Sequence, residues 1–153
     1  MKLITSFVAI AVFAFLTVGN SQASQHSKNI PEQNLDKSEK KENLGIGPIK
    51  ELKLGPINEA LAKEGKNIFN TKCFACHRMD SKLVGPALVP IVKKTNPVYL
   101  MNYLLNTTEM QKKEPEIKRL IKEYNGIAMP DQYLNEKQAR AVLEYMRAEA
   151  KEK

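Results

Sequence analysis

Residues Cys73-Phe74-Ala75-Cys76-His77 constrain the chain more than any other stretch of its sequence. Two cysteines separated by two residues and followed at once by histidine form the C-x-x-C-H pattern. This spacing lets both thiols form thioether bonds with the two vinyl groups on one edge of a haem, while the histidine lies under the iron. The pattern therefore predicts one covalently attached haem c, held by Cys73, Cys76 and His77.

Other uses of the two cysteines compete with this interpretation, since the chain contains no further cysteine. A redox dithiol of the thioredoxin kind is disfavoured because no βαβ pattern surrounds the pair. A zinc site is disfavoured because zinc takes four ligands and the only other histidine, His26, lies far away in the sequence. A surface disulfide beside an ordinary histidine stays open as the structural alternative.

The sequence on both sides of the motif has the apolar spacing of helices. We predict helices over 58–70, 97–106, 115–124 and 136–150, with an irregular loop over 79–90. Asn58 is the expected N-cap of the first helix, and Asn135 with Gln138 resembles a capping box before the last. No strand pattern is present, so the fold class is all-α, with short helices around the haem in one domain over 58–153.

The first 23 residues have the composition of a secretory signal peptide. Lys2 precedes the apolar segment 3–18, and Ser21 and Ala23 suit cleavage before Ser24. An uncleaved membrane anchor is the alternative, although a span usually needs about 20 apolar residues. We therefore expect export to the periplasm, with membrane anchoring if the segment is retained.

Residues 24–57 form a polar stretch poor in core-forming side chains, and we expect a flexible linker there. Such an arm is suited to peripheral association with a membrane or a membrane complex. The formal net charge of the 153-residue chain is +7. Because export argues against a nucleic-acid partner, the charge favours an acidic protein partner or an anionic membrane surface, or serves solubility alone.

Three segments around the motif give the chain a resemblance to the class I cytochromes c: Gly65–Phe69, Arg78–Pro86 and Val142–Arg147. The resemblance covers residues 59–150 and implies the cytochrome c fold. It also implies that Gly65 permits a close crossing of the first and last helices, with aromatic packing beside it. The carbonyl of Pro86 is implied to accept a hydrogen bond from His77 and so to orient the ligand ring.

The sixth iron ligand is expected to be a methionine, because no second histidine lies within the domain. Met79 is too close to His77 to reach the other haem face, Met101 and Met146 lie in predicted helices, and Met110 lies in a charged stretch that we expect to be exposed. Met129 lies in the loop 125–130 between two helices. In the family the distal ligand comes shortly before the last helix, and this resemblance favours Met129.

The resemblance implies a periplasmic electron carrier with His/Met ligation, which catalyses no reaction of its own and has no small-molecule substrate. Its partners would be redox proteins: a donor such as a quinol-oxidising complex, and a terminal reductase or oxidase as acceptor. Lysines at 72, 82, 93 and 94 are candidates for the rim of the haem edge. The alternatives are a haem-based sensor or enzyme with an open or displaceable distal site, and a docking module whose arm binds a membrane complex.

Overall fold

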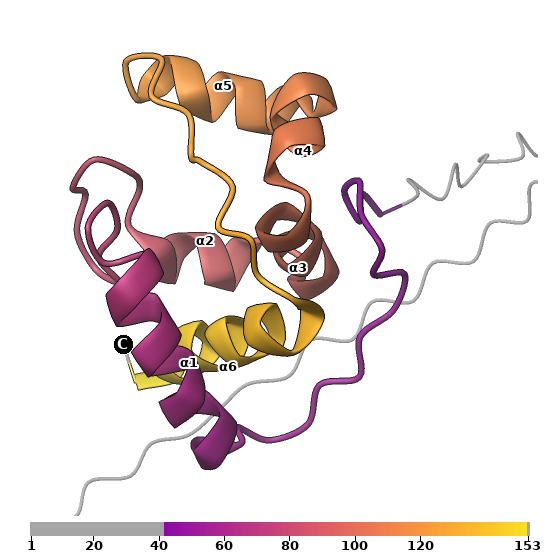
Figure 1. The fold of residues 1–153 in the computed structure, drawn as a ribbon, viewed down its shortest axis with the longest axis vertical. Helices are drawn as coiled ribbons and strands as arrows, with labels where there is room; N and C mark the ends of the chain where they lie inside the picture. Colours follow the sequence, from indigo (N-terminus) through magenta and orange to yellow (C-terminus); the bar gives the residue numbers. More distant parts are fainter. Residues whose placement is uncertain (1–41, 153) are drawn as a thin grey trace, which may run out of the picture. The chain divides into compact units, whose positions relative to one another are not determined.

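The computed structural model describes residues 42–152 of the chain (Figure 1). This part contains six α-helices and no strand. The helices are α1 (Glu59–Lys72), α2 (Leu88–Lys94), α3 (Pro97–Leu105), α4 (Thr107–Lys113), α5 (Pro115–Glu123) and α6 (Glu136–Glu152). The predicted all-α class is confirmed. None of these helices is long and apolar enough to cross a membrane. The expected signal peptide and residues 24–41 of the expected linker lie outside the described residues.

Helices α1 and α6 form the most extensive helix–helix contact of the described domain and cross closely at Gly65. A Cβ at this position would lie 1.9 Å from the carbonyl oxygen of Ala141, so only glycine lets the two backbones approach this far. Beside the crossing, the rings of Phe69 and Tyr145 pack with their centroids 5.2 Å apart. The expected close crossing and its aromatic contact are both present.

The helix starts follow the predicted capping residues. Asn58 Oδ1 accepts a hydrogen bond of 3.0 Å from the backbone N–H three residues further on. Before α6, Asn135 and Gln138 each accept a hydrogen bond from the other's backbone N–H, at 2.9 and 3.0 Å. Helices α3 and α5 begin with Pro97 and Pro115, where the missing N–H breaks no helical hydrogen bond. Local sequence therefore fixes where most of the helices begin.

Two short helices depart from the expected pattern. Helix α2 begins at Leu88, inside the stretch 79–90 that we expected to be a loop. Pro90 lies in its first turn, where proline is tolerated. Helix α4 follows α3 directly after Asn106, so the charged stretch between the predicted helices is itself helical. The sequence pattern does not reveal these two helices, because Pro90 indicates a loop and the charged residues before Pro115 indicate a link between helices.

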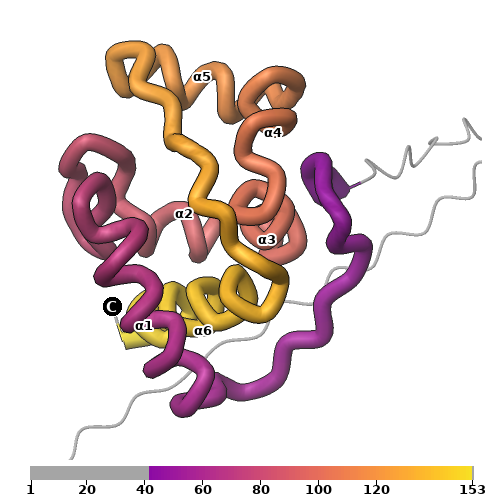
Figure 2. The backbone as a smooth tube through the Cα atoms, viewed as in Figure 1, coloured from indigo at the N-terminus to yellow at the C-terminus, as the bar shows by residue number. Residues whose placement is uncertain are grey.

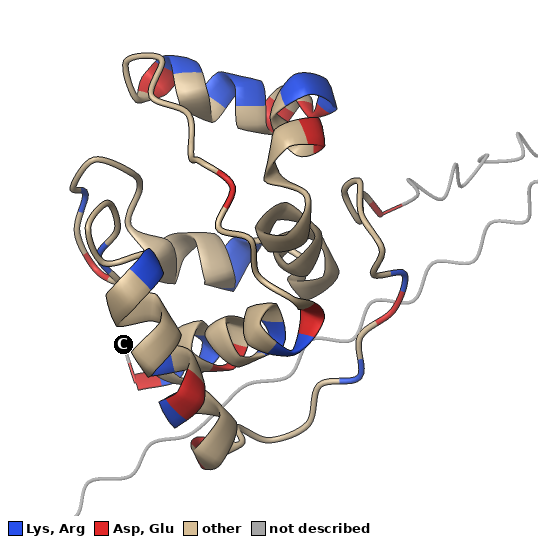
Figure 3. Ribbon diagram, in the orientation of Figure 1, with Lys and Arg blue, Asp and Glu red and all other residues tan. Residues whose placement is uncertain are grey.

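Met110 on α4 is fully buried (0% exposed), and the expectation that it lies exposed is wrong. It packs with Tyr99 and Ile117 in a small second core. The charged residues lie on the other face of α4, where Glu109 pairs with Lys113 at 2.8 Å. Figure 3 shows such charged positions along both α4 and α5. The charges mark one face of an amphipathic helix, with Met110 on the opposite face.

Residues 42–57, which we call the N-terminal strap, run beside α3 and lead into α1 (Figure 2). Ile49 is buried (7% exposed). The side chain of Asn102 accepts a hydrogen bond from Ile49 N–H (2.9 Å) and donates to the carbonyls of Ile49 (2.9 Å) and Leu44 (2.8 Å). For residues 42–57 the structure thus differs from the expected flexible linker, because side chains of the helical domain bind the strap's backbone.

Candidate functional site

The C-x-x-C-H motif forms a turn that continues directly from the end of α1. The N–H of Cys73 donates to the Phe69 carbonyl (2.8 Å), and the N–H groups of Cys76 and His77 donate to the Cys73 carbonyl (3.0 and 2.9 Å). The turn brings both cysteines and the histidine to the wall of one cavity. Both thiols are free, so they are not joined in a disulfide.

The ring of His77 is held by the loop that follows the motif. Its Nδ1 lies 3.1 Å from the carbonyl oxygen of Pro86, so Nδ1 is the donor and Nε2 keeps its lone pair. Gly85 lies against the ring, where a Cβ would come within 2.4 Å of His77 Cε1. The expected bond between His77 and Pro86 is therefore present, and the preceding glycine makes room for it.

The cavity has a volume of about 1130 Å³, above the range of roughly 300–1,000 Å³ that is usual for small ligands. Its wall is mainly apolar and includes residues of α1, α2, α3, α5 and α6: Phe69, Leu88, Ile91, Leu100, Leu104, Ile117, Leu120, Ile121, Val142 and Met146. A large flat macrocycle with an apolar body fits such a space. Two thiols and an oriented imidazole at the wall fit the donor set of haem c.

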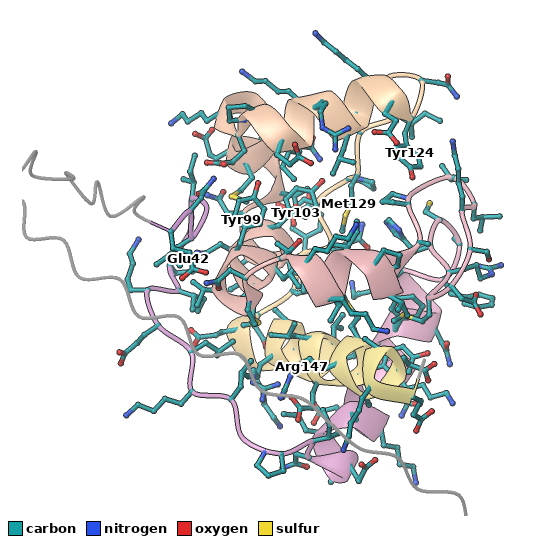
Figure 4. All side chains as sticks on the ribbon, turned by 180° about the vertical axis from the view of Figure 1, so that it is seen from behind. Glu42, Tyr99, Tyr103, Tyr124, Met129 and Arg147 are labelled. Carbon is teal, nitrogen blue, oxygen red and sulfur yellow. The ribbon has the colours of Figure 1, made fainter. Side chains whose placement is uncertain are left out.

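Met129 lies on the chain that crosses from α5 to α6, and its side chain also lines the cavity. Figure 4 shows it inside the domain, on the segment that descends from α5. That segment carries a single charged residue, Asp131 (Figure 3). The backbone carbonyl of Met129 accepts a hydrogen bond from Gln111 Nε2 at 2.5 Å, which ties the crossing chain to α4.

Of the other candidate methionines, only one lines the cavity. Met79, Met101 and Met110 are buried (6%, 1% and 0% exposed) but do not line it. Met146, on α6, both lines the cavity and belongs to the main core. The geometry thus leaves two methionines at the cavity, Met129 from a loop and Met146 from a helix.

Several cavity residues are absent from the set predicted from the sequence. Tyr99 and Tyr103, four residues apart on α3, both line the cavity, as do Glu42 and Asn43 of the strap. The aromatic spacing on α3 signals a buried face but not what that face contacts. Nothing in the polar sequence of the strap indicates that it reaches a haem-sized cavity.

The four rim lysines have different positions. Lys72 and Lys94 line the cavity, and Lys72 Nζ donates to the carbonyl of Gln132 (3.0 Å). Lys82 Nζ lies 4.5 Å from the centre of the Tyr124 ring. Lys93 lines a smaller, separate groove. Within residues 42–152, no three His, Cys, Asp or Glu side chains cluster in a way that could hold a metal ion.

Comparison with known proteins gives consistent results. The sequence profile described as Cytochrome c matches residues 62–149, more than half of the chain. Cytochrome c-551 of Stutzerimonas stutzeri is 50% identical over 39 residues, which are 25% of this chain. The match spans 38% of that protein's length.

Among solved structures, cytochrome c from Rhodothermus marinus is 47% identical with a TM-score of 0.67, covering 70% of this chain and 92% of that one. An engineered form of the same protein, bound to a carbene intermediate, is 46% identical with a TM-score of 0.63, covering 69% and 91%.

Proposed function

The chain belongs to the cytochrome c family, which binds covalent haem c; we propose that it is a haem-based electron carrier and that His77 and Met129 are its axial iron ligands. One observation carries the proposal: Cys73, Cys76, His77 and Met129 all line the same large apolar cavity. The first three come from a single turn, and Met129 comes from the separate chain between α5 and α6. Attachment at one wall and a soft sulfur ligand from another segment suit a six-coordinate iron.

The chain prepares His77 as a ligand. Burial lowers the pKa of the imidazole, while the hydrogen bond to the Pro86 carbonyl opposes this effect only in part. The ring is therefore neutral near pH 7, which is the form that binds a metal. The hydrogen bond at Nδ1 also fixes the ring's orientation and increases the donor strength of Nε2.

The protonation of Cys73 supports haem attachment over dithiol exchange. Burial raises the pKa of the Cys73 thiol to about 11, although Lys72 opposes this. Redox-active C-x-x-C pairs work through a thiolate whose pKa is depressed. A buried and protonated thiol is poorly suited to rapid exchange, whereas a thioether needs no thiolate once it has formed.

When bound, the haem supplies an iron that gains and loses one electron. The neutral thioether of Met129 and the apolar wall both disfavour the extra positive charge of the ferric state, which raises the reduction potential. Ligands fixed from two separate segments leave little to rearrange when the charge changes. We propose that the protein only transfers electrons, without a small-molecule substrate or a nucleic-acid partner.

We further propose a periplasmic location, supported by the signal-like composition of residues 1–23. The donor would be a quinol-oxidising complex and the acceptor a terminal reductase or oxidase. Lys72 and Lys94 at the cavity wall place positive charge where an acidic partner would dock. Residues before the strap are suited to peripheral association with the membrane.

Visible spectra of the haem-matured protein, ferric and ferrous, test the ligand assignment. We expect a c-type spectrum, the weak red band of methionine–iron(III) ligation, and no rapid carbon monoxide binding by the ferrous form. Met129→Ala should abolish the band and let the ferrous form bind carbon monoxide. Met146→Leu should keep the band and still exclude carbon monoxide. Loss of the band in Met146→Leu alone would reassign the ligand to α6.

A haem-based sensor or enzyme with a displaceable distal ligand is the second candidate. One observation favours it: the engineered relative from Rhodothermus marinus binds a carbene intermediate. Arg78 is not placed to assist such chemistry, because it stacks on the Phe74 ring at 3.7 Å and donates to the backbone carbonyl of His77, on the side of the motif rather than of Met129. Immediate carbon monoxide binding by the unmodified ferrous protein would favour this second function.

A further inference from the structure

The hydroxyl of Tyr99 is the one buried side-chain polar atom within residues 42–152 that has no hydrogen-bond partner. Tyr99 is only 8% exposed and lines the cavity. One turn further along α3, Tyr103 lines the same cavity, and its Oη accepts a long hydrogen bond of 3.5 Å from Gln111 Nε2. Because buried hydroxyls normally find partners, Tyr99 Oη indicates a missing acceptor.

The strap covers the part of the cavity where Tyr99 lies. Glu42 and Asn43 line the cavity there, and Asn43 Nδ2 donates to Glu114 Oε2 at 2.8 Å. The strap also packs on the tyrosine itself, since a Cβ on Gly45 would lie 3.1 Å from Tyr99 Cδ2. In Figure 4, Tyr99 and Glu42 lie on one side of the domain, and the loop that follows α1 lies on the other.

The chemistry of haem supplies an acceptor at this end. A haem tied through its vinyl edge to Cys73 and Cys76 carries its two carboxylates at the opposite edge of the ring. Burial raises the pKa of Tyr99, and so do the nearby carboxylates of Glu114 and Glu116, of which Glu114 is also close enough to act as a weak hydrogen-bond acceptor. The hydroxyl therefore keeps its proton near neutral pH and is available as a donor.

We propose that Tyr99 donates a hydrogen bond from Oη to a haem carboxylate at the end of the cavity that the strap covers. The inference rests on the proposed haem site but adds a positioning residue outside the C-x-x-C-H and Met129 segments. Glu114 is the competing acceptor within the chain, and it already accepts from Asn43. A donor bond stabilises the ionised carboxylate, so Tyr99 influences how the reduction potential depends on pH.

Redox titration of the holoprotein over a range of pH tests the proposal. Ionisation of a haem carboxylate produces a bend in the plot of potential against pH. In Tyr99→Phe we expect this bend to move up by about one pH unit, since a hydrogen bond to a charged group is being lost. We also expect the potential above the bend to fall. Tyr103→Phe, the matched variant, should leave the bend in place because Tyr103 lies one turn further along α3, away from Glu42 of the strap, where its Oη accepts from Gln111 Nε2.

Two outcomes would overturn the proposal: an unchanged bend in Tyr99→Phe, or equal shifts in both tyrosine variants. Glu114→Gln distinguishes a Tyr99 bond to Glu114 from a bond to the haem carboxylate. It removes a negative charge and should raise the reduction potential, whereas Tyr99→Phe should lower it. If Glu114→Gln instead lowers the potential as Tyr99→Phe does, the Tyr99 hydroxyl donates to Glu114 and the proposal is wrong.

The unmodified ferrous protein gives a second test if Tyr99→Phe fails to fold. Proton NMR should show through-space contacts between the Tyr99 ring and the methylene groups of a haem carboxylate side chain, and absence of these contacts rejects the proposal. Failure of the proposed function looks different, since the methionine–iron(III) band would then be missing from the unmodified protein and from every variant alike.

Discussion

The α1–α6 pair and the N-terminal strap are both fixed parts of the domain, but different contacts hold them. The pair packs through a stripe of apolar side chains and one crossing at Gly65. The strap has no helix or strand; Ile49 belongs to the main core and Leu44 and Leu52 pack against it, while hydrogen bonds to a few side chains, above all the three of Asn102, hold its backbone. The contacts of the pair are therefore spread over many side chains, whereas the strap's backbone hydrogen bonds are concentrated in single residues.

The largest effect should come from adding volume at the helix crossing. Gly65→Val places a Cβ where the Ala141 carbonyl already lies, 1.9 Å away, so the two helices must separate along their shared face. We expect a loss of about 3 kcal/mol or more in unfolding free energy, measured by denaturant titration. Gly55→Ala is the matched control, since a Cβ there meets nothing within 4 Å. Equal losses in both variants would show that the close approach does not limit stability.

On the strap, Asn102→Ala should have the next largest effect. It leaves the buried N–H of Ile49 and two backbone carbonyls without partners, which should cost about 2–3 kcal/mol. Hydrogen exchange should accelerate at Ile49 while amides at the α1–α6 crossing stay protected. Asn106→Ala, which removes one partly buried bond to the Ile46 carbonyl, should cost about 1 kcal/mol. Uniform acceleration across the domain would contradict a locally held strap.

This contrast explains which parts of the fold the sequence could predict. Helices α1, α3, α5 and α6 carry caps or first-turn prolines and apolar periodicity, so local rules were sufficient. The strap escaped prediction because its attachment depends on a pairing between residues 53 positions apart, Ile49 and Asn102. A single polar residue inside α3 gives no sign that it will bind another segment's backbone.

The cavity residues likewise include some that local sequence predicts and some that it does not. Cys73, Cys76 and His77 are adjacent in sequence, and their shared position on the cavity wall follows from one turn. The contact between His77 and Pro86 was expected only through a family resemblance. Tyr99 reaches the cavity through the packing of α3 against the strap, which no local pattern encodes.

Glu144 on α6 binds the N–H of Asn58, the residue that directly follows the strap, and offers a smaller, pH-dependent effect. Burial alone would raise the pKa of this fully buried carboxyl, but hydrogen bonds from the Asn58 N–H, Arg140 and Arg147 hold it below its ordinary value of 4.5. The ionised carboxylate therefore contributes stability above about pH 4.5, and this contribution is lost as the pH falls through the lowered pKa.

Glu144→Gln should cost about 2 kcal/mol at pH 7, since it removes one charge of a buried ionic cluster. The difference from the unmodified protein should shrink in acid, as followed by denaturant titration between pH 7 and 3. Glu116→Gln, in an exposed pair with Arg119, should leave stability unchanged across the same range. A difference for Glu144→Gln that stays constant with pH would mean that its charge contributes nothing.

Loss of the α6 cap should give the smallest effect and the sharpest test of the contrast. Asn135→Ala removes the oxygen that accepts from the Gln138 N–H, and we expect a loss of about 1 kcal/mol in unfolding free energy. Gln138→Ala should cost less, because the Asn135 N–H that it leaves is exposed and can bond to water. Neither variant should change hydrogen exchange at Ile49, since the cap touches only α6. Faster exchange there would mean that the strap and the α1–α6 pair unfold together, and the separation between distributed and concentrated contacts would then fail.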